Sequence, residues 1–376
     1  MKIAILTLPL HTNYGGILQA YALQTVLQRM GHEVEVLQAP AIRKRHPMLK
    51  SLAYGKRLAR KLLKDWNTPI LYEKKIKREQ MVIRQNTNRF ISSYINLRNI
   101  NSLKDVDPSD YDAIVVGSDQ IWRKLYFKMF WKSSLCDAFL GFTKEWNIRR
   151  ISYAASFGMD NISEYDECEI KECREAIREF DAVSVREDSG VKICTDYLAK
   201  EAINVLDPTL LLAMEDYVEI VDKSNVPYSQ GNMLCYILDS SDFKTNVIST
   251  VVKEKGLIPF NVFSDISNHS LPAEERIQPP VESWLRGFMD AKFVVTDSFH
   301  ACVFSIIFGK PFLAIGNSLR GMSRFTSLLS TFSLNDRLIL SESDLLKIPT
   351  LLHTPLPKNL CAHKESSLSF LRDSLS

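Results

Sequence analysis

The chain has 376 residues, of which 45% are hydrophobic and 24% are charged, and its formal net charge is +3. This length predicts two domains with full cores, and this charge gives no reason to expect a nucleic-acid partner. No apolar run approaches the roughly 20 residues of a membrane-spanning helix. The seven cysteines are scattered and never spaced as C-x-x-C, so we expect reduced thiols, no metal site and a cytoplasmic location.

The first forty residues predict a β-α-β unit. Lys2–Leu8 is an apolar strand, Ile17–Met30 has apolar residues at helical spacing, and Glu33–Leu37 alternates like a second strand. Such a unit implies a parallel sheet, whose strands are typically apolar on both faces.

A glycine-containing loop joins the first strand to the first helix. It reads Asn13, Tyr14, Gly15 and Gly16, and Gln19 follows one turn later. Paired glycines let the backbone approach a ligand, and the free N–H groups of a helix start attract anions or sugar hydroxyls. These residues are therefore candidates for lining a cleft, with a tight structural turn as the alternative.

The segment 43–98 is strongly basic. It carries sixteen lysines and arginines against three acidic residues, a local net charge of +13. One interpretation is a solvated helical insertion. The other is a surface that contacts anionic membrane from the cytoplasmic side or an acidic lipid-linked sugar carrier.

Four further apolar runs end abruptly in polar residues. In parallel sheets the carboxyl ends of the strands line the ligand crevice, so the residues that follow are candidates for a site. The runs and their followers are Ala113–Val116 with Ser118 and Asp119, Ile151–Ala155 with Ser156, Ala182–Val185 with Arg186, and Phe293–Val295 with Asp297, Ser298 and His300.

The second half of the chain predicts another α/β domain. Pro227, Ser229 and Gly231 break the pattern and suggest a linker. We expect a first domain over 1–215, a linker over 216–232, a second domain over 233–345, and a tail over 346–376 that packs back across both. The strands expected in the second domain are Met233–Leu238, Phe260–Phe263, Phe293–Val295 and Phe312–Ile315.

Charged residues near strand ends indicate an anion site. Arg186 follows one strand, and Arg320 and Arg324 follow Phe312–Ile315. Arginine holds phosphate and carboxylate through forked hydrogen bonds, although each of these arginines alone is more typical of a structural role. His300 begins an apolar helix, where it is either a structural residue or a group for proton transfer.

Several stretches together resemble the polysaccharide pyruvyl transferase family over nearly the whole chain. They are HTNYGGILQAYALQTVL, YDAIVVGSDQIWR, ISYAASFG, AVSVREDSG, VLDPTLLL and VVTDSFHACVFSIIFGKPFLAI. The resemblance implies two Rossmann-like domains in an arrangement similar to GT-B glycosyltransferases, with a central cleft. It also implies phosphoenolpyruvate as the donor, no cofactor, and ketal formation on a sugar of a cell-surface polysaccharide or its lipid-linked precursor.

The resemblance also suggests roles for individual residues. His300 matches the histidine expected to transfer protons, and Arg186 matches a donor-binding arginine. Many family members have an arginine where this chain has Ser298, so Arg320 or Arg324 would take over its contact with the donor.

Other matching positions would face the acceptor or support the histidine. Ser118 and Asp119 lie in a loop that would face the acceptor, and Asp297 is a candidate for orienting the imidazole of His300. Two alternatives stay open: a nucleotide-sugar glycosyltransferase on the same scaffold, and an inactive scaffold protein of polysaccharide synthesis.

Overall fold

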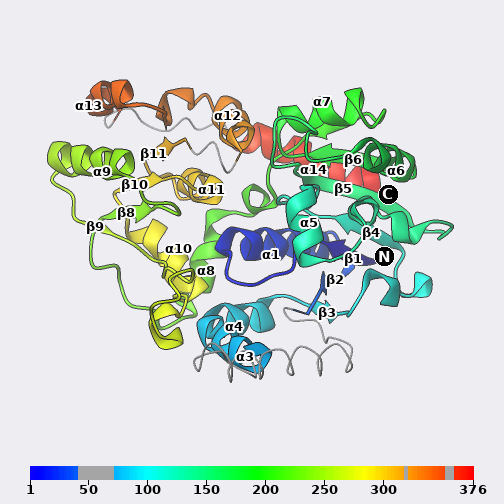
Figure 1. The fold of residues 1–376 in the computed structure, drawn as a ribbon. Coiled ribbons are helices and arrows are strands. Elements are labelled where there is room, and N and C mark those ends of the chain that lie inside the picture. Colours follow the sequence, from blue (N-terminus) through cyan, green and yellow to red (C-terminus); the bar gives the residue numbers. More distant parts are fainter. Residues whose placement is uncertain (41–71, 317–320, 352–359) are drawn as a thin grey trace, which may run out of the picture.

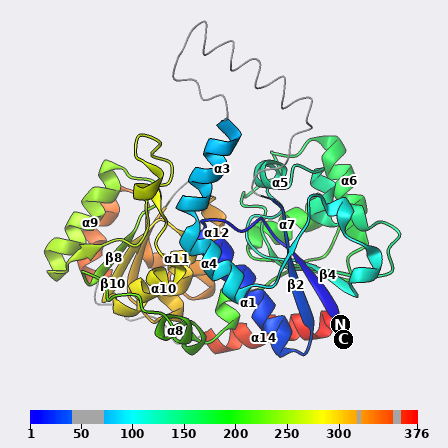
Figure 2. The ribbon, with the colours of Figure 1, turned by 90° about the horizontal axis from the view of Figure 1, so that it is seen from below.

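Two parallel sheets with helices on both faces stand side by side (Figure 1). This computed structural model describes residues 1–40, 72–316, 321–351 and 360–376. Both termini lie on the first domain, next to each other (Figure 2). The prediction of two α/β domains with parallel sheets is confirmed.

The first sheet has seven strands in the order β3-β2-β1-β4-β5-β6-β7, and all its pairings are parallel. The chain order reverses between β1 and β4, so the loops after these two strands diverge and open a crevice. The strands are β1 (Lys2–Leu6), β2 (Glu33–Gln38), β3 (Leu97–Asn99), β4 (Ala113–Val116), β5 (Arg149–Ala155), β6 (Ala182–Val185) and β7 (Ile203–Asn204).

The second sheet has five parallel strands in the order β12-β11-β10-β8-β9. Its order reverses between β10 and β8, which gives a second crevice at their carboxyl ends. The strands are β8 (Met233–Tyr236), β9 (Pro259–Phe260), β10 (Phe293–Thr296), β11 (Phe312–Ile315) and β12 (Leu338–Ile339).

Helices cover the sheets and fill the space between the domains. They are α1 (Tyr14–Arg29), α3 (Tyr72–Ile83), α4 (Gln85–Tyr94), α5 (Lys124–Phe130), α6 (Glu167–Arg178), α7 (Asp188–Asp196), α8 (Met214–Asp222), α9 (Asp242–Lys255), α10 (Val281–Asp290), α11 (Phe299–Ile307), α12 (Met322–Thr331), α13 (Ile348–Leu351) and α14 (Leu360–Leu375). None of the described helices is long and apolar enough to cross a membrane.

One apolar cluster continues from the first domain into the second. It includes Ile5 and Leu18 of the first domain together with Val294 and Phe304 of the second. Tyr217 of α8 meets Phe304 edge to face, with ring centroids 4.9 Å apart. Shared burial of this kind holds the two sheets in one relative orientation.

The first helix begins earlier than predicted. It starts at Tyr14, so the two glycines lie in its first turn instead of in a preceding loop. Asn13 is the N-cap in extended backbone, and its side chain makes no capping hydrogen bond. That side chain is consequently available for contacts across the crevice.

Two boundary predictions need correction. The linker predicted over 216–232 starts inside α8, because Tyr217, Ile220 and Val221 form a buried face that packs the segment as a helix. The basic segment predicted over 43–98 contains α3, α4 and the edge strand β3, and β3 pairs with β2 through Leu97 and Val36. Its residues 43–71 lie outside the described part of the chain.

The C-terminal segment touches both domains. α13 packs on α9 of the second domain, whereas α14 packs on the first. The backbone N–H of Leu206 donates to the hydroxyl of Ser367 at 3.0 Å, and the rings of Tyr153 and Phe370 lie 6.3 Å apart. The chain therefore crosses back to its first sheet before it ends.

Candidate functional site

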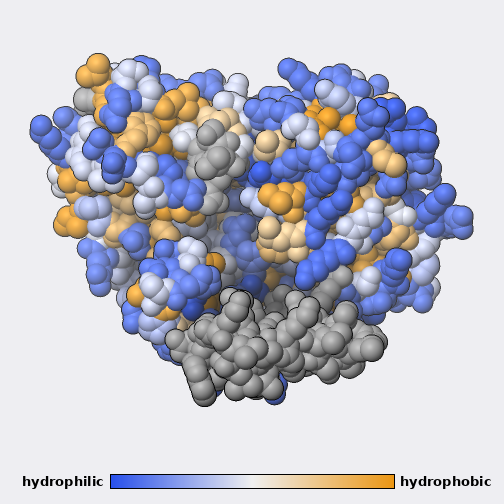
Figure 3. All heavy atoms as spheres, in the orientation of Figure 1, coloured by the Kyte–Doolittle hydropathy of each residue, from blue (hydrophilic) through white to orange (hydrophobic). Residues whose placement is uncertain are grey.

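A cavity of about 590 Å³ lies where the two crevices face each other. Figure 3 shows the surface hollowed between the two lobes. The loops after β1, β4, β8 and β10 contribute to its wall, as do the first turns of α1, α11 and α12. This is the position at which α/β sheets bind ligands.

Most of the residues singled out in the sequence meet in this cavity. Nine of them line it: Asn13, Gly15, Gly16, Gln19, Asp119, Asp297, Ser298, His300 and Arg324. Four are packed beneath or beside its wall: Tyr14, Ser118, Ser156 and Arg186. Arg320 lies outside the described residues.

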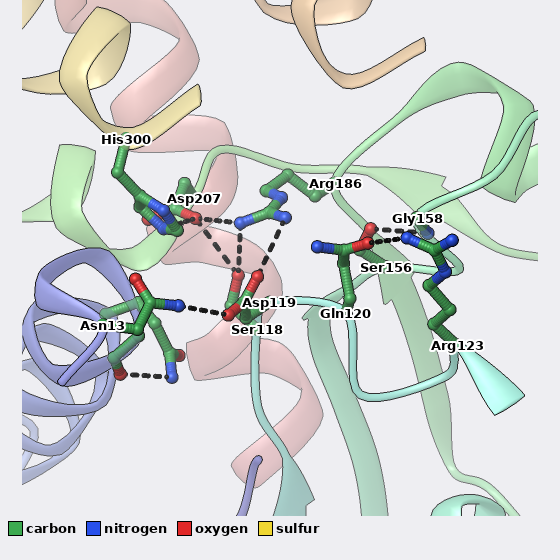
Figure 4. Close-up of polar contacts among 12 residues, drawn as sticks. Asn13, Ser118, Asp119, Gln120, Arg123, Ser156, Gly158, Arg186, Asp207 and His300 are labelled. Carbon is green, nitrogen blue, oxygen red and sulfur yellow. Dashed lines mark hydrogen bonds and ion pairs between the residues drawn. The ribbon is translucent and has the colours of Figure 1, made fainter. Parts of the chain in front are cut away.

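His300 stands in the first turn of α11 and points from the second domain toward the first (Figure 4). Its Nε2 lies 3.6 Å from Oδ2 of Asp207, which belongs to the first domain. The other side of the ring faces Gly15, where an added Cβ would lie only 2.1 Å from Nδ1. The imidazole therefore fits its place only because residue 15 has no side chain.

Asp207 is fully buried and accepts hydrogen bonds on both oxygens. Oδ1 accepts from the backbone N–H of Thr209 at 3.0 Å and from its hydroxyl at 2.7 Å. Oδ2 accepts from Arg186 at 2.7 Å and from Ser118 at 3.2 Å. Burial alone would raise the pKa of Asp207, but the neighbouring His300 and Arg186 lower it well below its usual value.

Arg186 does not reach the cavity, contrary to the expectation of a donor ligand. Its side chain is 2% exposed and pairs with Asp207, while Asp119 lies 3.6 Å away. Its guanidinium carbon sits 4.2 Å from the ring centroid of Phe299. Burial would lower the pKa of Arg186, yet the surrounding carboxylates raise it, so this cation is held by the protein itself.

Ser118 and Ser156 are also structural in this arrangement, because each is completely buried and donates to a carboxylate. Ser118 bonds Asp207, and Ser156 donates to Glu187 at 2.6 Å. Asp119, in contrast, lines the cavity. Its φ of 66° is unusual for a residue with a side chain and marks local backbone strain at the site.

Tyr14 was expected to line the cleft and instead joins the two domains. Its hydroxyl donates to the carbonyl of Pro279 at 2.8 Å, and its ring stacks on Trp284 with centroids 5.6 Å apart. An aromatic ring at this helix start buries more apolar surface against the second domain than it would in the open cleft.

Asp297 does not orient His300, contrary to expectation. It is fully buried and paired with Lys244 of α9 at 2.6 Å. It also accepts the backbone N–H groups of Leu238 at 2.7 Å and Asp239 at 3.2 Å. Asp297 thus ties together the loops after β8 and β10, and Asp207 occupies the place beside the imidazole.

Arg324 is the one lysine or arginine on the cavity wall among the residues that the structure describes. It lies in the first turn of α12, with its guanidinium carbon 5.8 Å from the ring centroid of Phe299. Burial, followed by the charge of Arg186, lowers the pKa of Arg324 to about 10. An anion bound in the cavity would relieve both effects.

Amide groups complete the wall on the side of the first domain. Asn13 donates to Oδ2 of Asp119 at 3.4 Å (Figure 4). Gln19 donates to the hydroxyl of Thr7 at 3.0 Å and to the carbonyl of Gly16 at 2.9 Å, while its buried Oε1 has no hydrogen-bond partner. An unpaired buried acceptor suits a ligand hydroxyl. No cluster of three or more His, Cys, Asp or Glu side chains able to hold a metal occurs in the described ranges.

Asp207 and Lys244 were not found from the sequence. Asp207 lies in the stretch VLDPTLLL, which carries part of the family resemblance, and its position shortly after a strand was the available signal. The sequence carried no signal for Lys244, because its ion pair with Asp297 forms only through the packing of α9 beside β10.

Two Rossmann-like domains that enclose a polar cavity at their facing strand ends define the GT-B-like class of folds. A family model described as polysaccharide pyruvyl transferase matches residues 13–318. The chain belongs to that family, which confirms the resemblance seen in the sequence. No curated protein gave a significant match.

A solved structure with a TM-score above 0.5 agrees with the class of fold, and two others are similar at lower scores. A UDP-GlcNAc 2-epimerase from Neisseria meningitidis is similar over 99% of this chain and 100% of its own, with 10% identity and a TM-score of 0.52. The epimerase from Methanocaldococcus jannaschii covers 99% of both chains with 11% identity and a TM-score of 0.49. Spinosyn forosaminyltransferase covers 100% of this chain and 95% of its own, with 11% identity and a TM-score of 0.44. At 10% identity the Neisseria meningitidis structure speaks for the fold alone.

Proposed function

We propose that the protein transfers a pyruvyl group from phosphoenolpyruvate to a sugar of a cell-surface polysaccharide or its lipid-linked precursor, forming a cyclic ketal. The observation that carries this proposal is His300, which lines the interdomain cavity beside a buried carboxylate and shares that cavity with Arg324. A histidine and an arginine supply the two things that the reaction needs, proton transfer and anion binding.

His300 would transfer the protons. It protonates the methylene carbon of phosphoenolpyruvate, and the neighbouring C2 becomes cation-like. One sugar hydroxyl attacks C2 and gives up its proton, the bond from C2 to the phosphate oxygen breaks, and a second hydroxyl closes the ketal. Of the two hydroxyl protons, one balances the proton on the new methyl group and the other leaves with phosphate. Histidine can act as acid and base near neutral pH.

Arg324 would hold the donor. Phosphoenolpyruvate carries a carboxylate and a phosphate, and a forked guanidinium binds either group. The first turns of α11 and α12 add the positive ends of two helix dipoles, although the N–H of Ser323 in α12 already donates to Asp160. Ser298, at the N-cap of α11, replaces the arginine of many family members with a smaller hydrogen-bonding group.

The opposite wall would hold the acceptor. Asn13, Gln19 and Asp119 present amide and carboxylate groups, which match the hydroxyls of an uncharged sugar ring. In this proposal the acceptor would lie against the first domain and the donor against the second, with His300 between the reacting groups.

The test is a reaction of the purified chain with phosphoenolpyruvate and a panel of sugar and lipid-linked sugar acceptors. We expect phosphate release that requires an acceptor, with one pyruvyl ketal on the product by mass spectrometry. Consumption of a nucleotide sugar in place of phosphoenolpyruvate would support the glycosyltransferase alternative. Turnover of neither donor would support an inactive scaffold.

Gly15→Ala tests the close fit between α1 and the imidazole. Residue 15 has ordinary helical backbone, and alanine favours a helix by about 1 kcal/mol over glycine. Its Cβ would nevertheless collide with the His300 ring, so the imidazole must move. We expect a roughly 10- to 100-fold loss of turnover in a folded protein, measured by phosphate release.

Gly16→Ala is the matched control, since its Cβ meets only the side chain of Asn13, at 3.1 Å from Nδ2. That side chain can shift, so a smaller loss is expected. Equal losses in both variants would show that the fit at Gly15 does not matter for turnover.

We also propose that the basic segment contacts anionic membrane. In its described part, α3 exposes Lys74, Lys75, Lys77 and Arg78, and Figure 2 shows α3 projecting from the body of the protein. Basic residues near an anionic surface contribute about 1 kcal/mol each. We expect binding to phosphatidylglycerol-containing vesicles at low salt, measured by co-sedimentation.

This binding should weaken toward physiological salt, where the screening length is about 8 Å. A triple change to glutamate at Lys74, Lys77 and Arg78 should reduce it, whereas Lys223→Glu at the C-cap of α8 should not. An absence of vesicle binding at low salt would leave these residues as a solvated face.

A further inference from the structure

The contacts of His300 continue into the first domain through buried charges. The imidazole lies beside the carboxylate of Asp207, and this carboxylate forms an ion pair with Arg186 (Figure 4). On the basis of the proposed function, we infer that Asp207 is a positioning residue that orients the imidazole, and that Arg186 acts through Asp207 instead of holding the donor.

The first argument is the rigidity of Asp207. Thr209 fixes one carboxylate oxygen with two hydrogen bonds, while Arg186 and Ser118 fix the other. All of these partners are buried. The carboxylate therefore cannot rotate freely, and it presents Oδ2 to Nε2 of His300. Nε2 is buried without a hydrogen-bond partner, and at 3.6 Å from Oδ2 a small shift of the ring would form a hydrogen bond that favours one tautomer and one ring orientation.

The second argument is electrostatic. During the proposed reaction the imidazole carries a positive charge, and Oδ2 of Asp207 lies 3.6 Å from its Nε2, within the distance of an ion pair. Arg186 pairs with the same carboxylate at 2.7 Å, Arg324 lines the same cavity, and the neighbouring Asp297 is paired with Lys244. Gly15 of α1 packs on the remaining side of the ring and brings no charge.

The third argument concerns Arg186. A donor ligand must reach solvent, but this side chain is 2% exposed and does not line the cavity. Two carboxylates, Asp207 and Asp119, already occupy its guanidinium. Its charge keeps Asp207 ionised in the interior, since an isolated buried carboxylate would be costly.

Asp207→Asn is the first test, because it keeps the shape of the side chain and removes its charge. We expect kcat to fall roughly 10- to 100-fold while KM for phosphoenolpyruvate stays nearly unchanged. Asp207→Glu keeps the negative charge but moves the carboxylate, so we expect kcat to stay low in this variant as well.

Arg186→Gln should show the same pattern, a loss in kcat with little change in KM for phosphoenolpyruvate. A rise in that KM as the main effect would identify Arg186 as a donor ligand and overturn its part of the inference. Asp207→Asn leaves the buried charge of Arg186 without this partner and can prevent folding. In that case the double variant with Arg186→Gln removes both charges and allows the same measurements.

An NMR measurement at fixed pH separates this inference from the proposed function. The ring nitrogen signals of His300, assigned by their absence in His300→Gln, should report a different tautomer or ring orientation in Asp207→Asn than in the parent. This measurement needs no substrate, so it holds even if phosphoenolpyruvate is not the donor. Unchanged ring signals, or an Asp207→Asn protein with parental kcat, would overturn the inference while leaving the proposed reaction in place.

Discussion

His300→Gln should lower phosphate release from phosphoenolpyruvate by at least about 100-fold, the lower end of the range for losing an acid–base group. Glutamine is close in size to histidine and keeps a polar group at the site, but it does not titrate near neutral pH. The ring lies in the first turn of α11, next to the cavity and at the edge of the apolar core. We therefore expect the variant to fold with a Tm close to that of the parent.

His363→Gln is the matched control for this experiment. His363 is an exposed histidine on α14, away from the cavity, and its replacement should leave turnover unchanged. A folded His300→Gln protein with near-parental phosphate release would refute proton transfer by His300. A variant that loses its fold would instead identify His300 as a structural residue.

Arg324→Ala should lower kcat/KM for phosphoenolpyruvate by about 30- to 1,000-fold, which corresponds to the roughly 2–4 kcal/mol expected when a buried charge pair loses one partner. The effect should appear mainly as a higher KM, because Arg324 lines the cavity where the donor anion would bind. Arg324→Lys should recover part of the loss, since lysine keeps the charge without the forked geometry. Steady-state kinetics with varied donor concentration separates these cases.

Arg372→Ala provides the control for removing an arginine. Arg372 is half exposed on α14 and pairs with Glu365, so its loss should not change the kinetics. If Arg324→Ala bound phosphoenolpyruvate as well as the parent does, the donor would have to be held elsewhere in the cavity.

The strands of the sheet interiors could be predicted from sequence because a parallel strand covered on both faces is apolar throughout. Ala113–Val116, Ala182–Val185 and Phe312–Ile315 have the predicted bounds. The short edge strands could not be predicted in this way. Leu97–Asn99 and Ile203–Asn204 mix polar and apolar residues, and only their pairing with a neighbouring strand makes them strands.

Site residues that directly follow a strand could be predicted from the sequence. Residues whose place depends on a partner from another segment of the chain could not. His300 and Arg324 line the cavity, as their positions after β10 and β11 suggested. The carboxylate beside the imidazole was not predictable, because Asp297 lies only three residues before His300 in the sequence but pairs with Lys244. Asp207 reaches it instead, and only the packing of one domain on the other brings the two together.

The imidazole and its carboxylate come from different domains, as do the imidazole and the glycine against which it packs. The packing of one domain on the other therefore sets the place of the imidazole. A substitution in the apolar cluster that the two domains share, such as one at the contact between Tyr217 and Phe304, would displace the ring without altering any residue of the cavity wall.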